Sequence, residues 1–214
     1  MIDFFLRNPK LYRFYQRIVR KKSHEYNFFK FFFRKINLKK IRMLDLCCGD
    51  SYILEYINEY IEDYLGVDNN EKYLAQCTKR WKKYKFLKLN IEDKKNIENF
   101  INFKPNIIFM NGAIHHLDDN NVKLINAFVV NIFTNCLFLS IDPVIDNNNL
   151  LNHLMIKFDR GKFIRNKSQY KELMKSFESF IVDDFYKMQF TNIFHFRNVN
   201  FESCYWDWKK EILK

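Results

Sequence analysis

Short apolar runs alternate with amphipathic stretches from residue 41 onward. A short apolar run is typical of a buried strand, and apolar residues three and four positions apart are typical of a helix. The runs predict strands over residues 41–47, 63–68, 85–91, 106–111 and 136–142. The amphipathic stretches predict helices over residues 51–61, 70–84, 91–101 and 118–133.

This alternation predicts an α/β fold, in which right-handed crossovers build a mostly parallel sheet with helices on both faces. After Pro143 the alternation stops. Residues 146–177 predict two helices with a turn between them, and 179–188 and 192–199 predict two strands joined by a short hairpin-like connection. Before the sheet, apolar residues at helical spacing within 4–35 predict a leading helical segment.

Length and composition favour one well-packed domain with an extra element, because the chain has 214 residues and 48% of them are hydrophobic. No apolar run approaches the roughly 18 residues that span a bilayer. The N-terminal stretch carries charges throughout, which a signal peptide's apolar centre lacks. We therefore expect a soluble, cytoplasmic protein with no membrane span.

The five cysteines are odd in number and lack CxxC spacing. Neither a disulfide framework nor a zinc site is predicted, and no metal is expected. Cys47 and Cys48 are neighbours, which makes a bond between them geometrically awkward. Cys136 lies in an apolar run and is predicted to be buried packing.

The net charge of +11 suggests a nucleic-acid or anionic-membrane partner. Most basic residues lie before position 42 or around 156–171, so a polyanion contact there stays an alternative. The opposing interpretation is compositional, because Lys, Asn, Ile and Phe are used heavily everywhere, including on plain helix faces.

In an open α/β sheet the ligand binds at the carboxyl ends of the strands. The first strand ends in DLCCGDS, and Asp68 ends the second strand, 68 − 49 = 19 residues past Gly49. An acidic residue about 20 positions after such a loop fits one that binds ribose hydroxyls. The alternative is that Asp68 only caps the helix beginning at Asn70. Gly112 falls directly after the fourth strand, where backbone close to a ligand or another segment is expected.

The third and fourth strands end in further candidates. Asn90 has an amide that can pair with a purine edge while Ile91 packs on its face, unless Asn90 caps the next helix. Two adjacent histidines, His115 and His116, follow the fourth strand. Successive positions do not share a helical face, which argues against a chelating pair, whereas one histidine fits a general base. In the alternative, His116 packs internally and His115 hydrogen-bonds the backbone.

These strand ends resemble those of the class I S-adenosylmethionine-dependent methyltransferases. The resemblance covers roughly residues 40–200 and is carried by MLDLCCGDS, YLGVD, LKLNIED, IIFMNGAIHHLDD and LFLSIDPVI. It implies a Rossmann-like seven-stranded sheet in the order 3-2-1-4-5-7-6, with S-adenosyl-L-methionine as cofactor and S-adenosyl-L-homocysteine as product. NPKLYRFYQRIV and FDRGKFIRNKSQYKEL also look like a subgroup of small bacterial methyltransferases that often occur with surface-polysaccharide or other secondary biosynthesis.

The resemblance also implies an organisation into parts. Residues 1–38 would form a helical cap over the cofactor, 39–200 the core and 201–214 a packed tail. Within the core, 146–177 would be a helical insertion on the substrate side. The residues expected to bind the cofactor are Asp45, Cys47, Cys48, Gly49, Asp68, Asn69, Asn90, Ile91, Asn111 and Gly112, with Tyr12 and Gln16 of the leading segment.

Their implied roles follow the parts of the cofactor. Asp45 and the loop backbone would hold its amino-acid part, and Asp68 the ribose. The family's GxGxG loop has Cys47 and Ser51 in place of the first and third glycines. Because this cofactor has no pyrophosphate, small residues are expected to be tolerated there if their backbone angles are ordinary. NAD is disfavoured, since its pyrophosphate requires those glycines.

Methyl transfer from a sulfonium is an in-line displacement, so the protein mainly aligns the reactants and excludes water. A base is needed only if the acceptor releases its proton with difficulty. His115 is the first candidate and His116 the second. Residues expected on the substrate side are Asp142, Arg160 and Arg165. In the alternative, Asp159 and Arg160 form a turn held at Gly161, and Arg165 is a surface charge.

The leading interpretation is a methyltransferase for a small-molecule acceptor, with oxygen favoured over nitrogen, that acts as a monomer or homodimer. Two alternatives stay open: an RNA or DNA methyltransferase that uses the basic N-terminal region, and a cofactor-binding subunit without catalysis. Against the first, the fourth strand ends in NGAI, where amino-methylating nucleic-acid enzymes usually carry Asn/Asp-Pro-Pro-aromatic. A nucleic-acid partner is therefore disfavoured.

Overall fold

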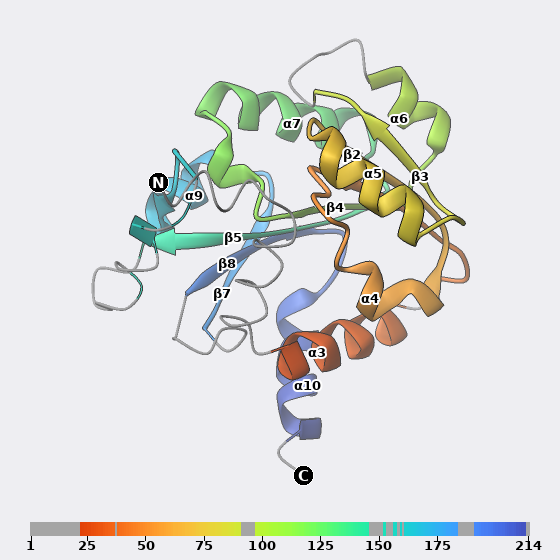
Figure 1. The fold of residues 1–214 in the computed structure, drawn as a ribbon. Helices are drawn as coiled ribbons and strands as arrows, with labels where there is room; N and C mark the ends of the chain where they lie inside the picture. Colours follow the sequence, from red (N-terminus) through yellow and green to blue (C-terminus); the bar gives the residue numbers. More distant parts are fainter. Residues whose placement is uncertain are drawn as a thin grey trace.

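The computed structural model describes residues 22–36, 38–90, 97–145, 152, 156–157, 159, 161–183 and 191–212. Its sheet runs in the order β3-β2-β1-β4-β5-β8-β7 (Figure 1). The strands are β1 (Ile41–Leu46), β2 (Ile61–Asp68), β3 (Lys85–Lys88), β4 (Ile107–Asn111), β5 (Leu137–Ile145), β7 (Glu178–Val182) and β8 (Asn192–Arg197).

The strand directions confirm the predicted architecture. β1 to β5 are mutually parallel, and β8 lies antiparallel between β5 and β7. The predicted order 3-2-1-4-5-7-6 is therefore observed, with one addition. A two-residue strand, β6 (Arg165–Asn166), pairs in parallel with the end of β5 at Val144 and Ile145.

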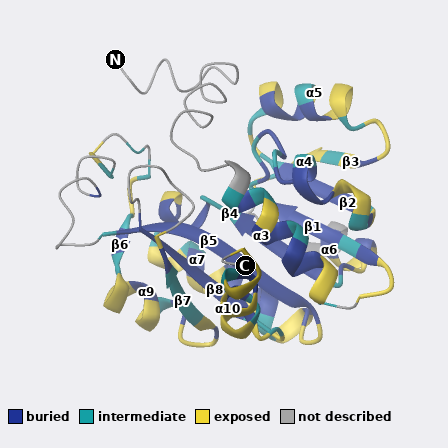
Figure 2. Ribbon diagram, turned by 90° about the horizontal axis from the view of Figure 1, so that it is seen from below, coloured by how far each residue is buried: buried dark blue, intermediate teal, exposed yellow. Residues whose placement is uncertain are grey.

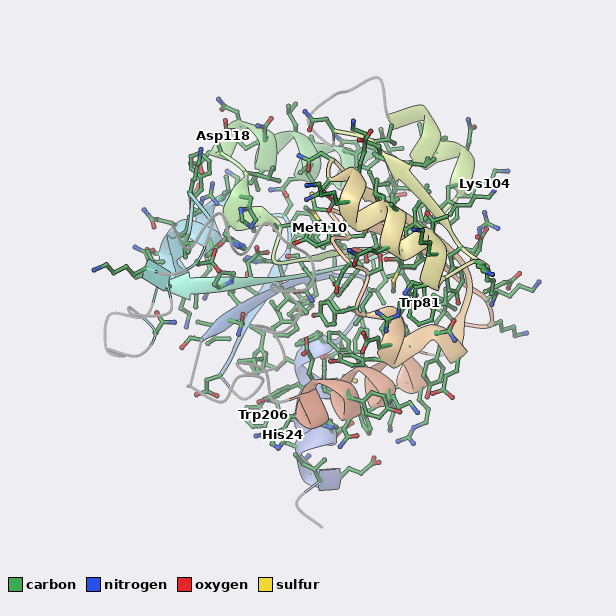
Figure 3. All side chains as sticks on the ribbon, in the orientation of Figure 1. His24, Trp81, Lys104, Met110, Asp118 and Trp206 are labelled. Carbon is green, nitrogen blue, oxygen red and sulfur yellow. The ribbon has the colours of Figure 1, made fainter. Side chains whose placement is uncertain are left out.

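Helices cover both faces of this sheet (Figure 1). They are α3 (Lys22–Lys35), α4 (Leu54–Ile57), α5 (Glu71–Arg80), α6 (Ile97–Phe103), α7 (Asp119–Ile132), α9 (Lys167–Leu173) and α10 (Phe201–Ile212). Figure 1 shows α3, α4 and α10 on one side of the sheet and α6 and α7 on the other. Asp118, labelled in Figure 3, caps α7 by accepting a hydrogen bond from the backbone N–H of Asn121.

The period-two alternation of strand side chains divides the core into two clusters. In β4, Ile107 and Phe109 face the cluster shared with α3, α4 and α10, whereas Ile108 and Met110 face the cluster shared with α6, α7 and α9. Each of these four residues is at most 1% exposed. Apolar residues on both faces of one strand are what a parallel sheet covered on both sides requires. Figure 2 shows these central strands buried, with exposed residues on the outer sides of α5 and α9.

Residues Phe201–Ile212 form the terminal helix α10, which packs against α3. Phe201 and Trp208 of α10 are at most 2% exposed and make edge-to-face contacts with Phe28 of α3, with ring centroids 5.3 and 5.4 Å from it. Trp206, labelled in Figure 3, faces outward and is 49% exposed. The leading helix and the tail are therefore joined in one aromatic cluster on one side of the sheet.

The predicted helix over 51–61 is shorter in the structure. Only Leu54–Ile57 is α-helical, a 3₁₀ turn follows over Asn58–Tyr60, and β2 begins at Ile61. The periodicity of SYILEYINEYI overstated the helix because Ile61 pairs with Ile41 of β1 in the sheet. Pairing with a neighbouring strand overrides a local helical pattern.

Some predicted residues and boundaries lie outside the described residues. Tyr12, Gln16, Ile91 and Arg160 are among them, as are all of residues 1–21 and most of residues 146–158. The division into cap, core, insertion and tail stays a prediction. In the part of the chain that the structure describes, no helix has both the length and the apolar character that crossing a membrane requires.

Candidate functional site

The carboxyl ends of β1, β2, β4 and β5 lie side by side because these strands are parallel neighbours. Asp45 of β1 is in register with Gly66 of β2, and Asn111 of β4 with Ile141 of β5. The polar residues that the sequence placed after separate strands are thus brought to one edge of the sheet. This edge, at the point where the strand order reverses, is where ligands bind in open α/β sheets.

Asp68 ties the loop after β1 to the loop after β2. One carboxylate oxygen accepts a hydrogen bond from the backbone N–H of Gly49 at 2.8 Å, and the other accepts from the N–H of Asn70 at 2.8 Å. The cap of α5 is Asn70, whose side chain accepts from the N–H of Lys72. The alternative in which Asp68 only caps that helix is wrong. A carboxylate is the kind of acceptor that ribose hydroxyls require, so Asp68 has the chemistry to bind them.

The loop after β1 has strained backbone angles. Cys47 has φ 57°, Gly49 φ 54° and Ser51 φ 51°. Cys47 and Ser51 were expected to be tolerated if their backbone angles are ordinary. That condition is not met, since both residues occupy the left-handed region that favours glycine. At Gly49 an added Cβ would meet no atom within 4 Å, so the backbone angle is what requires this glycine. The loop keeps the conformation of a glycine-rich loop without its glycines.

Buried polar side chains of β1, β2 and α5 stabilise the loop after β1 and the end of the strand that precedes it. Asp45 is 2% exposed and accepts a hydrogen bond from the hydroxyl of Tyr64. Burial raises the pKa of Asp45 to about 8, and the Tyr64 bond opposes this rise only in part. Ser51 receives a hydrogen bond from the thiol of Cys77 at 3.6 Å. A cation bound close to this carboxyl group would favour its ionised form and lower its pKa.

A chain of hydrogen bonds leads from the leading helix to the end of β4. The amide of Asn111 donates to the hydroxyl of Tyr52, and that hydroxyl donates to Glu25 of α3 at 2.8 Å. Glu25 is 3% exposed. The sequence-based prediction placed Asn111 here but missed Tyr52 and Glu25. The only signal for Glu25 was an acidic residue within a basic, aromatic helix.

His115 is buried between two carboxylates. Its Nδ1 lies 2.8 Å from Oδ1 of Asp142, and its Nε2 lies 3.2 Å from Oδ1 of Asp159. Asp142 is 0% exposed and also accepts from the backbone N–H of His115. Asp142 was predicted on the substrate side, whereas the structure places it behind the imidazole. The alternative for the two histidines is reversed, because His115 is buried and His116 is exposed.

These carboxylates decide the protonation of His115. Burial lowers the pKa of His115, but the hydrogen bonds to Asp142 and Asp159 outweigh it and raise the pKa to about 9. At neutral pH both ring nitrogens therefore hold protons. In this arrangement His115 donates hydrogen bonds, and it would accept a proton only after Asp159 has left Nε2. The role of base stays a prediction that requires this displacement.

A segment of the predicted insertion closes over His115. The N–H of Phe163 donates to the carbonyl of His115 at 2.9 Å, and the N–H of Gly161 donates to Asp159 at 2.6 Å. A Cβ at Gly161 would lie 2.0 Å from Cδ2 of His115, so only glycine permits this contact. The predicted turn at Gly161 is thus seated on the candidate site. Asp159 is a site residue that the sequence-based prediction placed only in this turn.

Arg165 was predicted to contact the acceptor or to be a surface charge. Its side chain is 8% exposed, and its guanidinium makes five hydrogen bonds: two to Asp119 and one each to the carbonyls of Ile114, Leu117 and Phe163. These bonds use all five N–H donors of an arginine. Arg165 therefore joins the insertion to the turn that carries the histidines, and its description as a surface charge is wrong.

The remaining predicted residues occupy the same edge. Gly112 has φ 63°, and its N–H donates to the carbonyl of Ile141 at 2.7 Å. Cys48 is 8% exposed, and its N–H donates to the carbonyl of Val67. Asn69 and Asn90 are exposed. Their contacts with a cofactor stay predictions.

The two adjacent histidines are closer together than the argument from helical faces implied. They lie in a 3₁₀ turn, Ile114–His116, and their ring centroids are 4.2 Å apart. One ligand atom from each of His115, His116 and Asp159 can be chosen so that all three lie within 4.8 Å of one another. The geometry therefore gathers two imidazoles and a carboxylate at the end of β4.

Comparison with known proteins identifies one family model. Residues 43–130 match a model described as a methyltransferase domain. This match spans β1 to most of α7, and therefore includes the loop after β1, Asp68 and both histidines. No curated protein sequence matches the chain.

Solved structures share the fold over most of the chain. The methyltransferase domain of the bacterial protein CtHen1 has a TM-score of 0.59 and 14% identity, over 82% of this chain and 98% of that one. The plantazolicin methyltransferase BamL, solved with a triazolic desmethylPZN analog and SAH, has a TM-score of 0.59 and 16% identity, over 98% and 87%. A SAM-dependent methyltransferase from Anabaena variabilis has a TM-score of 0.55 and 12% identity, over 73% and 76%.

Proposed function

We propose that this chain is a class I S-adenosylmethionine-dependent methyltransferase that methylates a small-molecule acceptor, at oxygen in preference to nitrogen. The methyltransferase-domain match over residues 43–130 and the shared fold support this proposal. BamL, a fold neighbour that covers almost the whole chain, was solved with a triazolic desmethylPZN analog and SAH. A buried histidine beside the strand ends supports an oxygen acceptor, since a hydroxyl has a proton to lose.

The contacts of Asp68 support the cofactor assignment most directly. Asp68 joins the loops after β1 and β2 through Gly49 and Asn70, so its carboxylate lies between the two loops that a bound nucleoside would contact. We propose that Asp68 binds the ribose hydroxyls, while Asn90 and Ile91 contact the adenine. Two acceptor oxygens fit two neighbouring hydroxyls.

The amino-acid part of the cofactor would lie over Asp45 and the loop from Cys47 to Gly49. A cationic ammonium group above Asp45 would favour the ionised carboxylate and return its pKa towards ordinary values. Asn111, held by Tyr52, and Gly112 would line the same side. Tyr12 and Gln16 are proposed to cover the cofactor from the leading segment.

The reaction itself needs alignment more than chemistry from the protein, because S-adenosylmethionine already carries an activated methyl group. The acceptor oxygen would approach beside His115, in line with the methyl carbon and the sulfur. An acceptor hydroxyl that displaces Asp159 from Nε2 removes one of the two carboxylates that hold the proton. The pKa of His115 then falls, and the imidazole becomes able to accept the hydroxyl's proton.

The substrate side would be formed by the segment around Gly161 and by the end of β5. Arg160 is proposed to contact the acceptor there. We propose that Asp142 and Arg165 position other residues and do not contact the acceptor. Asp142 binds Nδ1 of His115, and the guanidinium of Arg165 donates its hydrogen bonds to groups of the protein itself. Surface-polysaccharide or secondary-metabolite biosynthesis is the context we propose for such an acceptor.

A nucleic-acid acceptor is the second candidate, favoured by the net charge of +11. One fold neighbour is described as a small RNA methyltransferase, HEN1. Binding through phosphates would weaken steeply with salt. The third candidate is a subunit that binds the cofactor without catalysis. It predicts cofactor binding without turnover on any acceptor, which distinguishes it from the other two.

The test is the release of S-adenosylhomocysteine with a panel of phenols and sugar derivatives in one arm and RNA oligonucleotides in the other. We expect turnover with a hydroxyl-bearing small molecule. In the His115→Ala variant turnover should fall much more than cofactor affinity. Turnover with RNA alone would replace the proposal by its alternative, and unchanged turnover in His115→Ala would remove this histidine as the base.

A further inference from the structure

We propose that His115, His116 and Asp159 form a binding site for one divalent transition-metal ion at the carboxyl end of β4. Two imidazoles and one carboxylate are a ligand set that suits Zn²⁺, Mn²⁺, Co²⁺ or Ni²⁺ better than Mg²⁺, which prefers oxygen ligands. The three ligand atoms come within 4.8 Å of one another. Metal binding at this site does not depend on the proposed function, although its role in methyl transfer does.

The spacing of two of the ligands already fits a metal. Around a tetrahedral ion with bonds of about 2.0–2.1 Å, neighbouring ligand atoms are roughly 3.3 Å apart. Nε2 of His115 and Oδ1 of Asp159 are 3.2 Å apart. His116 is exposed, and its ring lies beside that of His115 with centroids 4.2 Å apart, so it is close enough to supply the third ligand.

The surroundings of His115 orient it as a ligand. Asp142, which is 0% exposed, binds Nδ1 at 2.8 Å, so that Nε2 is the nitrogen directed towards Asp159. A carboxylate behind a histidine is the common outer-shell partner of metal-bound imidazoles, where it fixes the ring and the tautomer. Gly161 keeps Asp159 in place, because any side chain at that position would collide with the His115 ring.

The charges are also complementary to a dication. A metal ion would displace the proton from Nε2 of His115, because a histidine ligand must offer that nitrogen's lone pair. Asp142 and Asp159 would then bring two negative charges to the site. Arg165 directs its guanidinium to Asp119 and to backbone carbonyls, and not to the three ligands.

Three protein ligands leave coordination positions open for a water or a substrate oxygen. An ion held here would face the acceptor side of the proposed cofactor site. In the metal-bound protein Nε2 of His115 would be a ligand, so His115 would not act as the base. The ion would instead bind an acceptor hydroxyl and lower its pKa, and the hydroxyl's proton would pass to water before the oxygen attacks the methyl carbon. This role rests on the proposed function, whereas the site itself does not.

The experiment is calorimetric titration of Zn²⁺, Mn²⁺ and Mg²⁺ into the chelator-treated full chain, without cofactor or acceptor. We expect one equivalent of Zn²⁺, bound more tightly than Mg²⁺. Loss of an outer-shell partner alone typically weakens metal binding at least about 10-fold, so removal of a direct ligand in His116→Ala or Asp159→Asn should weaken Zn²⁺ binding by at least that factor. His116 is exposed, so its variant should keep the fold, which circular dichroism checks.

Cysteines are the competing zinc ligands in this chain, and Cys47→Ser provides the matched control. Unchanged Zn²⁺ affinity in Cys47→Ser, with the losses in His116→Ala and Asp159→Asn, supports the site. Absence of binding to the unaltered chain at millimolar Zn²⁺ overturns it, as does full binding in His116→Ala. A separate titration with S-adenosylhomocysteine tests cofactor binding. Failure of the proposed function would appear in that titration, whereas failure of the metal site would appear only in the Zn²⁺ titration.

Discussion

Cys47→Gly should stabilise this protein, although it removes a partly buried side chain. Cys47 has φ 57° at a position where the backbone favours glycine. A non-glycine residue pays roughly 1–2 kcal/mol for the left-handed conformation. Glycine costs about 0.4–1 kcal/mol through the greater freedom of the unfolded chain. The difference predicts a gain of about 0.5–1 kcal/mol in the free energy of unfolding.

Its neighbour supplies the matched control. Cys48 is 8% exposed and is not among the described residues with positive φ, so Cys48→Gly only loses packing and adds unfolded-state entropy. That variant should lose about 1–3 kcal/mol. Urea denaturation followed by circular dichroism measures both, and a gain of 1 kcal/mol corresponds to about 2–4 °C in Tm for a chain of this size. If Cys47→Gly destabilises the protein as much as Cys48→Gly, the argument from backbone strain is refuted.

Three further changes test other parts of the structure. Gly161→Ala should lower the free energy of unfolding by about 1–3 kcal/mol, because its Cβ collides with His115, whereas Lys162→Ala on the exposed next residue should leave urea denaturation unchanged. Arg165→Lys should lower the free energy of unfolding by about 2 kcal/mol in the same assay, since a lysine has three donors for the five hydrogen bonds of the guanidinium. An unaltered urea midpoint would contradict a stabilising role for these bonds. Burial lowers the pKa of His195 to about 3, so the unfolded chain binds more protons between about pH 3 and 6.5, and stability should fall with acidification at up to about 1.4 kcal/mol per pH unit. His195→Gln should flatten that slope in denaturation curves across this pH range, and an unchanged slope would contradict the assignment.

The order of strands was predictable because each buried strand is a short apolar run between amphipathic stretches. The predicted end of the helix in SYILEYINEYI was wrong, because its helical periodicity continues up to the first residue of β2. Pairing of Ile61 with Ile41 decides that boundary, and such pairing is invisible in a single segment. At Gly66 of β2 a Cβ would lie 2.7 Å from the Phe86 ring, so this strand position requires glycine for packing.

The polar strand ends were also predictable, because parallel strands bring their carboxyl ends together. What the sequence did not reveal is which polar groups face one another. Glu25 reaches Tyr52 and Asp159 reaches His115 only through tertiary packing, over separations of 27 and 44 residues (52 − 25 and 159 − 115). The left-handed angles of Cys47 and Ser51 were equally hidden, since those residue types normally avoid them.

The central claim is that Asp68 and the loop after β1 hold the nucleoside of S-adenosylmethionine. Calorimetric titration of S-adenosylhomocysteine into the full chain, and into Asp68→Asn, tests it most directly. We predict one site with a micromolar Kd, weakened at least about 10-fold in the variant while circular dichroism stays unchanged. Absence of binding at millimolar concentration, or equal affinity in Asp68→Asn, would contradict the account.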